Sequence, residues 1–381
     1  MRLLIVSIML ALFMGACSSG KRAFERGNYY EAVMKSVNRL KSDPNNSKAL
    51  ATLEKAYPFA LNYYQDLIDD QLSVDSPFKW TGVIGYLETI NKMASQIALC
   101  PAAKQLVPEP KKYVRELDRA KQRAAEEQYR AGEQNLAQRT RLSAKEAYYL
   151  FKKADNFVRG YKDVAKKILE AKDLATIKVI VEPTDVRSKR YQLSVDFFHD
   201  QLMNYLYANH KYFPFAQFYS PEEAKKARVR YPDQVIRLRF NDFMVGKSHL
   251  TERILNVESK DSVKVGTVKL KDGSKADVMG IVKAQLKIYK QEIISAGVLD
   301  MEVEDFQNNR TIKRKQFPGR YIWFDEWGSF NGDERALIGK ELDICNRKQI
   351  LPPPPQEMFI AFTEPIYAQI TDYMRRVYRK Y

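Results

Sequence analysis

Apolar side chains in the first half of the chain recur every three to four residues, which is the spacing of one face of a helix. Leu50, Leu53, Ala56 and Tyr57 share such a face. The segment Lys111–Arg141 alternates basic residues with Glu and has few large apolar residues, which predicts a long, mostly solvated helix. That helix is open to two interpretations, a partner-binding surface or a plain exposed helix.

The period changes to two after residue 176, which is typical of half-buried strands. Ile236, Leu238 and Phe240, for example, alternate with arginines. The same reasoning predicts helices over 192–207 and 358–378, with the prolines of 352–355 as an extended spacer before the second. The predicted strands are 178–181, 235–240, 263–270, 276–289, 299–304, 311–317 and 320–327.

Turn signals join these strands into an antiparallel meander with one covered face. The tetrad Lys271-Asp272-Gly273-Ser274 predicts a hairpin, because its turn needs positive φ, and Asn308-Asn309 marks another turn. We therefore predict an α+β fold, a helical array followed by a mostly antiparallel sheet with packed helices. The predicted divisions are 1–16 (signal peptide), 17–22 (linker), 23–175 (helical domain), 176–351 (sheet domain) and 352–381 (spacer and closing helix).

The amino terminus has the form of an export signal. Arg2 precedes an apolar run, Leu3–Met14, that is too short to cross a bilayer as a mature helix. The tetrad Met14-Gly15-Ala16-Cys17 resembles a bacterial lipobox, with methionine in place of the usual leucine. That resemblance implies cleavage before Cys17 and covalent lipid on it, an anchor that needs no spanning helix. The alternative is a cysteine that merely ends a hydrophobic signal or short anchor.

The composition limits which classes of partner the chain can bind and which kinds of metal or disulfide site it can form. The 381 residues carry 63 Lys and Arg against 47 Asp and Glu, a net charge of +16 spread over both halves. In an exported chain, anionic lipid headgroups, acidic proteins or cell-wall carboxylates are better counterparts than nucleic acid, although a solvated lysine-rich surface explains the charge equally well. Three histidines and three cysteines leave little for a metal site, and we expect Cys100 and Cys345 to be free thiols rather than a disulfide.

The densest polar and aromatic cluster runs from Trp323 to Arg335. Trp323, Trp327 and Asp325 could recognise a partner or a glycan, and Asp325, Glu326 or Asp333 could serve a hydrolase. A calcium loop is disfavoured because the Asp-x-Asp-x-Asp-Gly pattern is missing. We expect Gly328 and Gly332 to shape a turn and Asp333 to cap the helix after it.

A second aromatic stretch, 212–219, offers Tyr212, Phe215 and Tyr219 as a binding surface, with core packing as the alternative.

Other motifs give weaker evidence for a binding or catalytic site. Val245-Gly246-Lys247-Ser248 lacks the earlier glycine of a phosphate-binding loop, since Asn241 stands there. The histidines lack the spacing of a zinc protease, and we predict no enzyme activity, metal or nucleic-acid partner.

Two resemblances follow from these motifs. The segments 27–46 and 147–165 resemble tetratricopeptide repeats, and with the lipobox the chain resembles a Bacteroidota-type envelope lipoprotein. The order of elements after residue 178 is faintly similar to curli-secretion and penicillin-binding-protein-activator lipoproteins. The resemblance implies a periplasm-facing outer-membrane lipoprotein that acts as a scaffold or accessory subunit of an envelope complex. A peptidoglycan- or glycan-binding module is the alternative, and no cofactor beyond the lipid on Cys17 is implied.

Overall fold

The computed structural model describes residues 20–381, so the signal peptide and Cys17 lie outside the described residues. The chain divides into two compact units on either side of the Ala175–Thr176 bond. In residues 20–381, no helix has the length and apolar character needed to cross a membrane.

The N-terminal unit is an array of helices. Neighbouring helices along the chain pack on one another, around buried side chains that include Leu53, Ile90 and Phe151. This confirms the predicted helical array. Its helices are α2 (Gly20–Glu25), α3 (Tyr29–Ser42), α4 (Ser47–Ser73), α5 (Lys79–Ala98), α6 (Pro101–Leu106), α7 (Val114–Ala137), α8 (Arg141–Phe157) and α9 (Val164–Ala175).

Helix α7 is less solvated than its charge pattern predicts. Ala120, Ala124 and Gly132 are buried on a face that packs against α5 and α8. A Cβ atom on Gly132 would lie 2.7 Å from the ring of Phe151, so the small residue permits close helix approach. The prediction of a mostly solvated helix was therefore wrong for this face, because small side chains give little hydrophobic signal.

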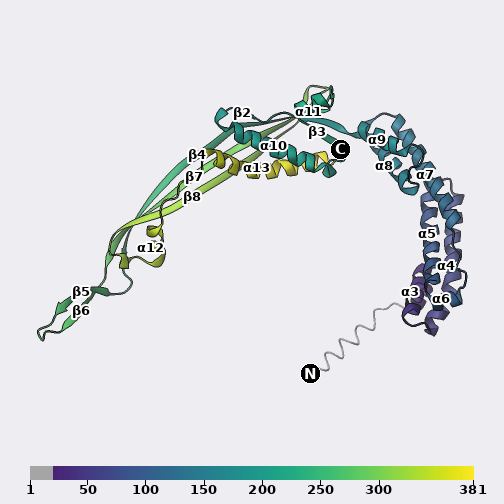
Figure 1. Ribbon diagram of the computed structural model, residues 1–381, viewed down its shortest axis with the longest axis horizontal. Helices are drawn as coiled ribbons and strands as arrows, with labels where there is room; N and C mark the ends of the chain where they lie inside the picture. Colours follow the sequence, from purple (N-terminus) through teal and green to yellow (C-terminus); the bar gives the residue numbers. More distant parts are fainter. Residues whose placement is uncertain (1–19) are drawn as a thin grey trace. The chain divides into compact units, whose positions relative to one another are not determined.

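The C-terminal unit is built on one six-stranded sheet of order β3-β1-β4-β7-β8, with β2 also paired to β4 (Figure 1). The pairs β4–β7 and β7–β8 are antiparallel, whereas β1 runs parallel to β3 and β4, and β2 runs parallel to β4. The α+β fold with a mostly antiparallel sheet is thus confirmed. Its strands are β1 (Ile177–Val181), β2 (Asp185–Val186), β3 (Ala216–Tyr219), β4 (Gln234–Glu258), β7 (Lys283–Asp305) and β8 (Arg310–Gly332).

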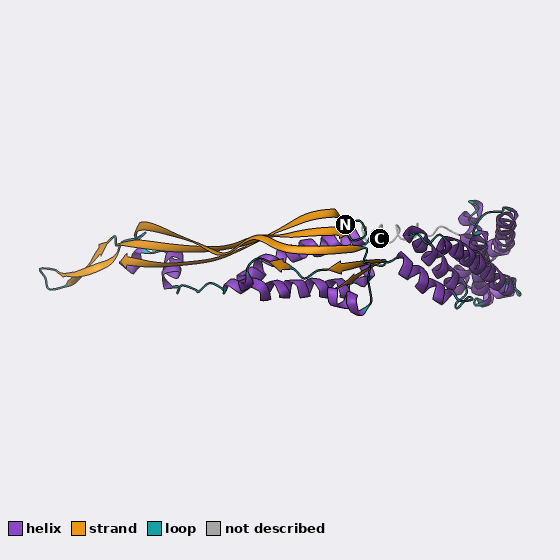
Figure 2. Cartoon of the chain, turned by 90° about the horizontal axis from the view of Figure 1, so that it is seen from above, coloured by secondary structure: helices purple, strands orange, loops and turns teal. Residues whose placement is uncertain are grey.

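Two long helices, α10 (Gln192–Ala208) and α13 (Pro355–Tyr378), cover one face of this sheet (Figure 2). The predicted closing helix is confirmed, and it begins at Pro355, within the predicted spacer. The core between helices and sheet contains alternating residues of β7, such as Leu299 and Met301, and an aromatic cluster around Phe359 and Phe362. A short helix, α11 (Pro221–Lys226), follows β3.

The three long strands continue past this cover as what we call the distal ribbon: residues 247–258 of β4, 283–294 of β7 and 322–332 of β8. Residues 247–254 of β4 are exposed on both faces. Helix α12 (Gly339–Asn346) packs on β8 here, close to Gly328. A separate two-stranded hairpin, β5 (Val263–Lys269) and β6 (Lys275–Gly280), lies in the chain between β4 and β7 (Figure 1).

Strand boundaries differ from prediction in several places. β4 extends to Glu258, far past the predicted 235–240, and the predicted strand 299–304 is the end of β7. The predicted strand 276–289 is broken, because β6 ends at Gly280 and β7 begins at Lys283 to pair with β4. Ser259, directly after β4, donates its N–H to the carbonyl of Val282, directly before β7. This hydrogen bond joins the ends of the two strands where the chain enters and leaves the hairpin. The predicted strands 311–317 and 320–327 form one continuous strand, β8, since Pro318 lies on an edge strand, where proline is tolerated.

We predict that Gly319→Ala destabilises the C-terminal unit by about 2 kcal/mol through overpacking. A Cβ atom there would lie 2.2 Å from the carbonyl oxygen of Phe362, so α13 must move away. Urea unfolding followed by the fluorescence of Trp323 and Trp327 measures the change. Gly266→Ala, which has open space around its Cβ position, is the control and should leave the midpoint unchanged.

Candidate functional site

Trp323, Asp325 and Trp327 lie on β8 within the distal ribbon, and because they alternate along a strand their side chains share one face. Gly328 is part of the same strand and pairs with Ile288, so the predicted turn at Gly328 is wrong. The strand ends at Gly332, whose φ of +129° is a conformation that suits glycine. The cluster is therefore a strand face rather than a loop.

Asp325 is buried, with 6% of its surface exposed. Its carboxylate accepts a hydrogen bond of 2.7 Å from the backbone N–H of Ile350. That contact attaches the segment between α12 and α13 to β8. Asp325 thus has a structural partner already, and its burial contradicts a role in direct glycan or partner contact.

Trp327 and Trp323 are half-buried on the same face. The Trp327 ring stacks on Tyr289 of β7, with ring centroids 5.7 Å apart and planes inclined by 19°. Trp323 of β8 is paired with Ile293 of β7, which is buried. The two tryptophans therefore form part of an aromatic strip along the ribbon, with Trp327 held in place by Tyr289.

Apolar side chains are also exposed on the distal ribbon at positions that the sequence reasoning missed. Ile322 and Phe324 point to the face opposite Trp323 and are 46% and 67% exposed. On the tryptophan face, Leu250 and Ile254 of β4 are 56% and 52% exposed. The available signal was the run Ile322-Trp323-Phe324, since consecutive large apolar residues in a strand place apolar surface on both faces.

Both edges of the distal ribbon lack a strand partner among the described residues. β8 is the last strand in the sheet order, and β1 and β2 pair with β4 no further than Phe240. An unpaired strand edge presents backbone N–H and C=O groups that can bind another chain. The ribbon therefore combines exposed apolar side chains with open hydrogen-bonding edges.

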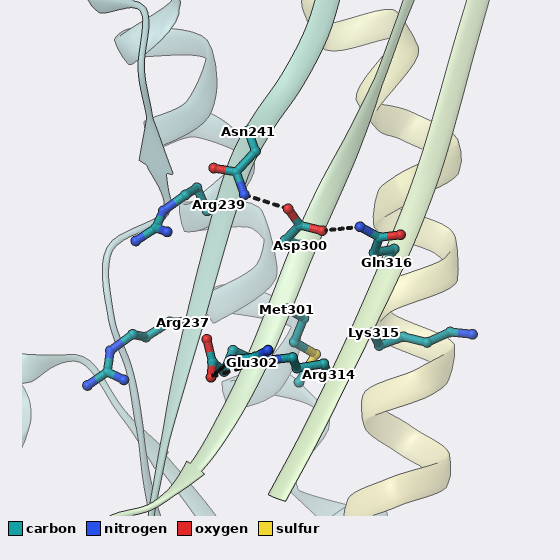
Figure 3. Close-up of a pocket in the computed structure, with 9 residues that line it drawn as sticks. All are labelled: Arg237, Arg239, Asn241, Asp300, Met301, Glu302, Arg314, Lys315 and Gln316. Carbon is teal, nitrogen blue, oxygen red and sulfur yellow. Dashed lines mark hydrogen bonds and ion pairs between the residues drawn. The ribbon is translucent and has the colours of Figure 1, made fainter. Parts of the chain in front are cut away.

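A polar hollow of about 700 Å³ lies nearer the base of the three long strands (Figure 3). Asp300 of β7 accepts hydrogen bonds from Asn241 of β4 at 2.5 Å and from Gln316 of β8 at 2.8 Å. Figure 3 shows this row crossing the three strands. The hollow is lined by Arg237, Arg239, Asn241, Asp300, Met301, Glu302, Arg314, Lys315 and Gln316.

The charged groups of the hollow are mostly engaged with one another. The Thr311 hydroxyl and the Arg314 guanidinium, which lies 3.1 Å from the carboxylate, hold the pKa of Glu302 below its usual value. Arg237 binds Glu304 and Glu182, and Arg239 binds Asp185 at 2.9 Å. We conclude that the hollow joins the strands through paired side chains and leaves no carboxylate there free for acid–base chemistry.

Asp333 is engaged in a similar way. Its side chain accepts the backbone N–H of Arg335 and so caps a short 3₁₀ turn, Glu334–Ala336, where the sequence predicts a capped helix. Hydrogen bonds from the Arg335 side chain and backbone lower the pKa of Asp333 to about 2. Arg335 also donates to the Lys264 carbonyl at 2.7 Å, which connects this turn to β5.

The aromatic stretch 212–219 is not part of this surface. Phe215 is fully buried, so its predicted binding role is wrong, because a side chain with no exposed surface cannot contact a partner. Tyr212 is 37% exposed and has the cationic groups of Lys211 and Arg375 over its ring, and Tyr219 is partly buried. The strand register places this stretch about 33 Å or more along the sheet from Trp323, at roughly 3.3 Å per residue.

Within residues 20–381, no group of three or more His, Cys, Asp or Glu side chains is placed to hold a metal ion. Cys100 is buried and Cys345 is partly buried, and both are free thiols, as predicted. Burial raises the pKa of the Cys345 thiol, with Glu341 adding to the effect, so the reactive thiolate is disfavoured there.

We predict that Asp325→Ala frees the segment before α13. Loss of one hydrogen bond to a charged group should raise amide hydrogen exchange of the 347–351 peptide about tenfold. Glu326→Ala, on the opposite face of β8, is the matched control. Unchanged exchange in Asp325→Ala would show that this contact does not hold the segment.

Comparisons with known proteins add little to this picture. No protein-family model and no curated protein matches the chain. Among solved structures, a Helicobacter pylori protein described as a neuraminyllactose-binding hemagglutinin homologue matches 54% of this chain and 91% of its own length, at 10% identity. The TM-score is 0.23, too low to support any conclusion about the fold or function of this chain.

Proposed function

We propose that the chain is a non-enzymatic lipoprotein of the outer membrane that faces the periplasm and acts as a scaffold or accessory subunit of an envelope complex. The observation that supports this most is the distal ribbon, where exposed apolar side chains lie beside unpaired strand edges. Natural proteins normally cover or blunt such edges. A partner that covers the edge of the distal ribbon is therefore the simplest explanation of its exposed apolar side chains and unpaired strand edges.

The partner that fits is an extended segment of another protein, paired as an added strand to the outer edge of β8. Main-chain hydrogen bonds would supply affinity, and pockets for alternate side chains would supply specificity. Ile322 and Phe324 would contact apolar residues of that segment. Before the ribbon, β8 carries Arg310, Lys313, Lys315 and Arg320, so a segment that continued from the ribbon along this edge would meet positive charge there.

A non-catalytic role fits the carboxylates of the ribbon. Asp325 is bound to the Ile350 N–H, and Asp333 is bound to Arg335, so two of the three acids considered for hydrolysis have structural partners. Lipid on Cys17 would keep the ribbon at the membrane where envelope complexes assemble.

The test is in-cell crosslinking followed by affinity purification from detergent-solubilised envelopes. We expect a discrete set of partner proteins, weakened at least tenfold by the double variant Ile322→Asp/Phe324→Asp, because a charge disfavours burial of this surface. Leu193→Asp is the matched control, since Leu193 is 84% exposed on α10, outside the ribbon. Recovery of the protein alone, or equal recovery of partners by both variants, would refute the proposal.

Cys17→Ser in the same experiment, with membranes washed at high salt to remove charge-driven contacts with anionic lipid, tests the anchor. The unlipidated chain should leave the washed membranes and lose its envelope partners, since covalent lipid supplies stable attachment only when acyl chains are present. Full retention of Cys17→Ser in the salt-washed membranes would exclude a lipid anchor at this residue.

A glycan-binding module is the second candidate, favoured by the stacked Tyr289–Trp327 pair at the partly exposed ribbon face. Aromatic rings are suited to stacking against sugar faces. This function predicts retention on purified peptidoglycan that Trp323→Ala and Trp327→Ala abolish, with Tyr149→Ala in the helical unit as control. Equal retention by all variants would remove this candidate.

A further inference from the structure

Within residues 20–381, the hairpin β5–β6 forms a sheet of its own, in which each strand pairs only with the other. Its link to the rest of the unit includes the Arg335 hydrogen bond to the Lys264 carbonyl. A single two-stranded hairpin is marginally stable by itself in water. The hairpin therefore gains from any surface that covers it.

The two faces of the hairpin differ in chemistry. Val268 is paired with Ala276, and Gly266 with Val278, so these positions share a face that Leu270 continues. Val268, Leu270 and Val278 are 48%, 48% and 42% exposed. The opposite face contains the pairs Thr267–Asp277 and Lys269–Lys275. An apolar face is thus open to solvent next to a basic one.

The tip carries a net positive charge, because residues 268–275 contain three lysines and one acid, Asp272. Lys269 is directly opposite Lys275, an arrangement of like charges that destabilises a strand pair. Lys271 follows in the turn, and none of these three lysines has an ion-pair partner within residues 20–381. Asp277 forms an ion pair with Lys264 at 2.5 Å, whereas Asp272 accepts hydrogen bonds from Ser274 and keeps its negative charge.

Part of the turn backbone is hydrogen-bonded within the turn. The Leu270 N–H donates to the Ser274 carbonyl at 2.8 Å, and the Gly273 N–H donates to the Leu270 carbonyl at 2.9 Å. Gly273 adopts a φ of +84°, which the tight turn requires. These hydrogen bonds lower the cost of bringing this part of the main chain close to a poorly hydrated layer.

We propose that this tip, residues 268–275, binds the surface of an anionic lipid membrane. The lysines would contact lipid phosphates, while Val268 and Leu270 enter the interface between headgroups and acyl chains. Long lysine side chains can reach headgroups from beside apolar residues, which suits Leu270 between Lys269 and Lys271. A lipid surface presents anionic groups and an apolar layer together, which matches both properties of the tip. This proposal does not depend on the partner role of the distal ribbon.

The test is cosedimentation of the mature chain carrying Cys17→Ser, which has no acyl anchor, with vesicles. We expect binding to vesicles of phosphatidylglycerol and phosphatidylcholine in equal parts, weak binding to phosphatidylcholine alone, and loss of binding as salt rises. Lys269→Gln/Lys275→Gln should weaken binding about 25-fold, at about fivefold for each lysine. Lys152→Gln/Lys153→Gln makes the same charge change on exposed residues of α8 and should have little effect.

A second measurement distinguishes insertion of the tip from general attraction of a basic protein. Leu270→Trp should add fluorescence that shifts to shorter wavelength with anionic vesicles, relative to the parent chain. Equal loss of binding in both lysine pairs, or no shift from Leu270→Trp, would overturn the proposal. So would tip variants that bind vesicles normally but lose a protein partner in the crosslinking experiment, which would assign the hairpin to a protein instead.

Discussion

Phe362 of α13 packs where β7 and β8 both carry a glycine, and the C-terminal unit depends on this close approach. Cβ atoms on Gly297 and Gly319 would lie 2.9 Å and 2.2 Å from atoms of Phe362. With α13 held at that distance, Phe359 and Ile366 complete a core that also receives α10. The cover by α10 and α13 ends where α13 begins, and beyond that point α12 packs on β8.

The exposed part of the sheet needs other sources of rigidity. Near its base, rows of polar side chains join the three strands, as in the Asn241–Asp300–Gln316 row. Farther along, α12 and the Asp325 contact with Ile350 hold the following segment against β8. These contacts let a long ribbon keep its shape while its edges and several apolar side chains stay available to other molecules, which is the basis of the proposed scaffold role.

The carboxylates of Asp325 and Asp333 show that the surroundings of a side chain decide which chemical role it can have. Asp325 and Asp333 occur in a sequence that is compatible with a hydrolase, yet each accepts backbone N–H groups and stabilises local structure. Burial and hydrogen bonding set what a carboxylate can do, and neither is encoded by residue type or by spacing within one loop. The same applies to Phe215, which is aromatic and lies in a polar-aromatic run but is buried in the core.

The hydrophobic periods along the chain determined the helical first half, the α+β second half, the hairpin at Asp272-Gly273 and the closing helix, because local burial patterns reflect local geometry. Tertiary structure alone decided the rest. The alternation over 276–289 is the same whether the strand pairs with β5 or with β4, so the break at Gly280 depends on pairings between residues distant in sequence. The partner of Asp325 is 25 residues away along the chain, and the exposure of Leu250 and Ile254 on the tryptophan face depends on where α13 begins. Such contacts form only when the whole sheet and its cover assemble, which is why a pattern read along one strand could predict the strand but not its surroundings.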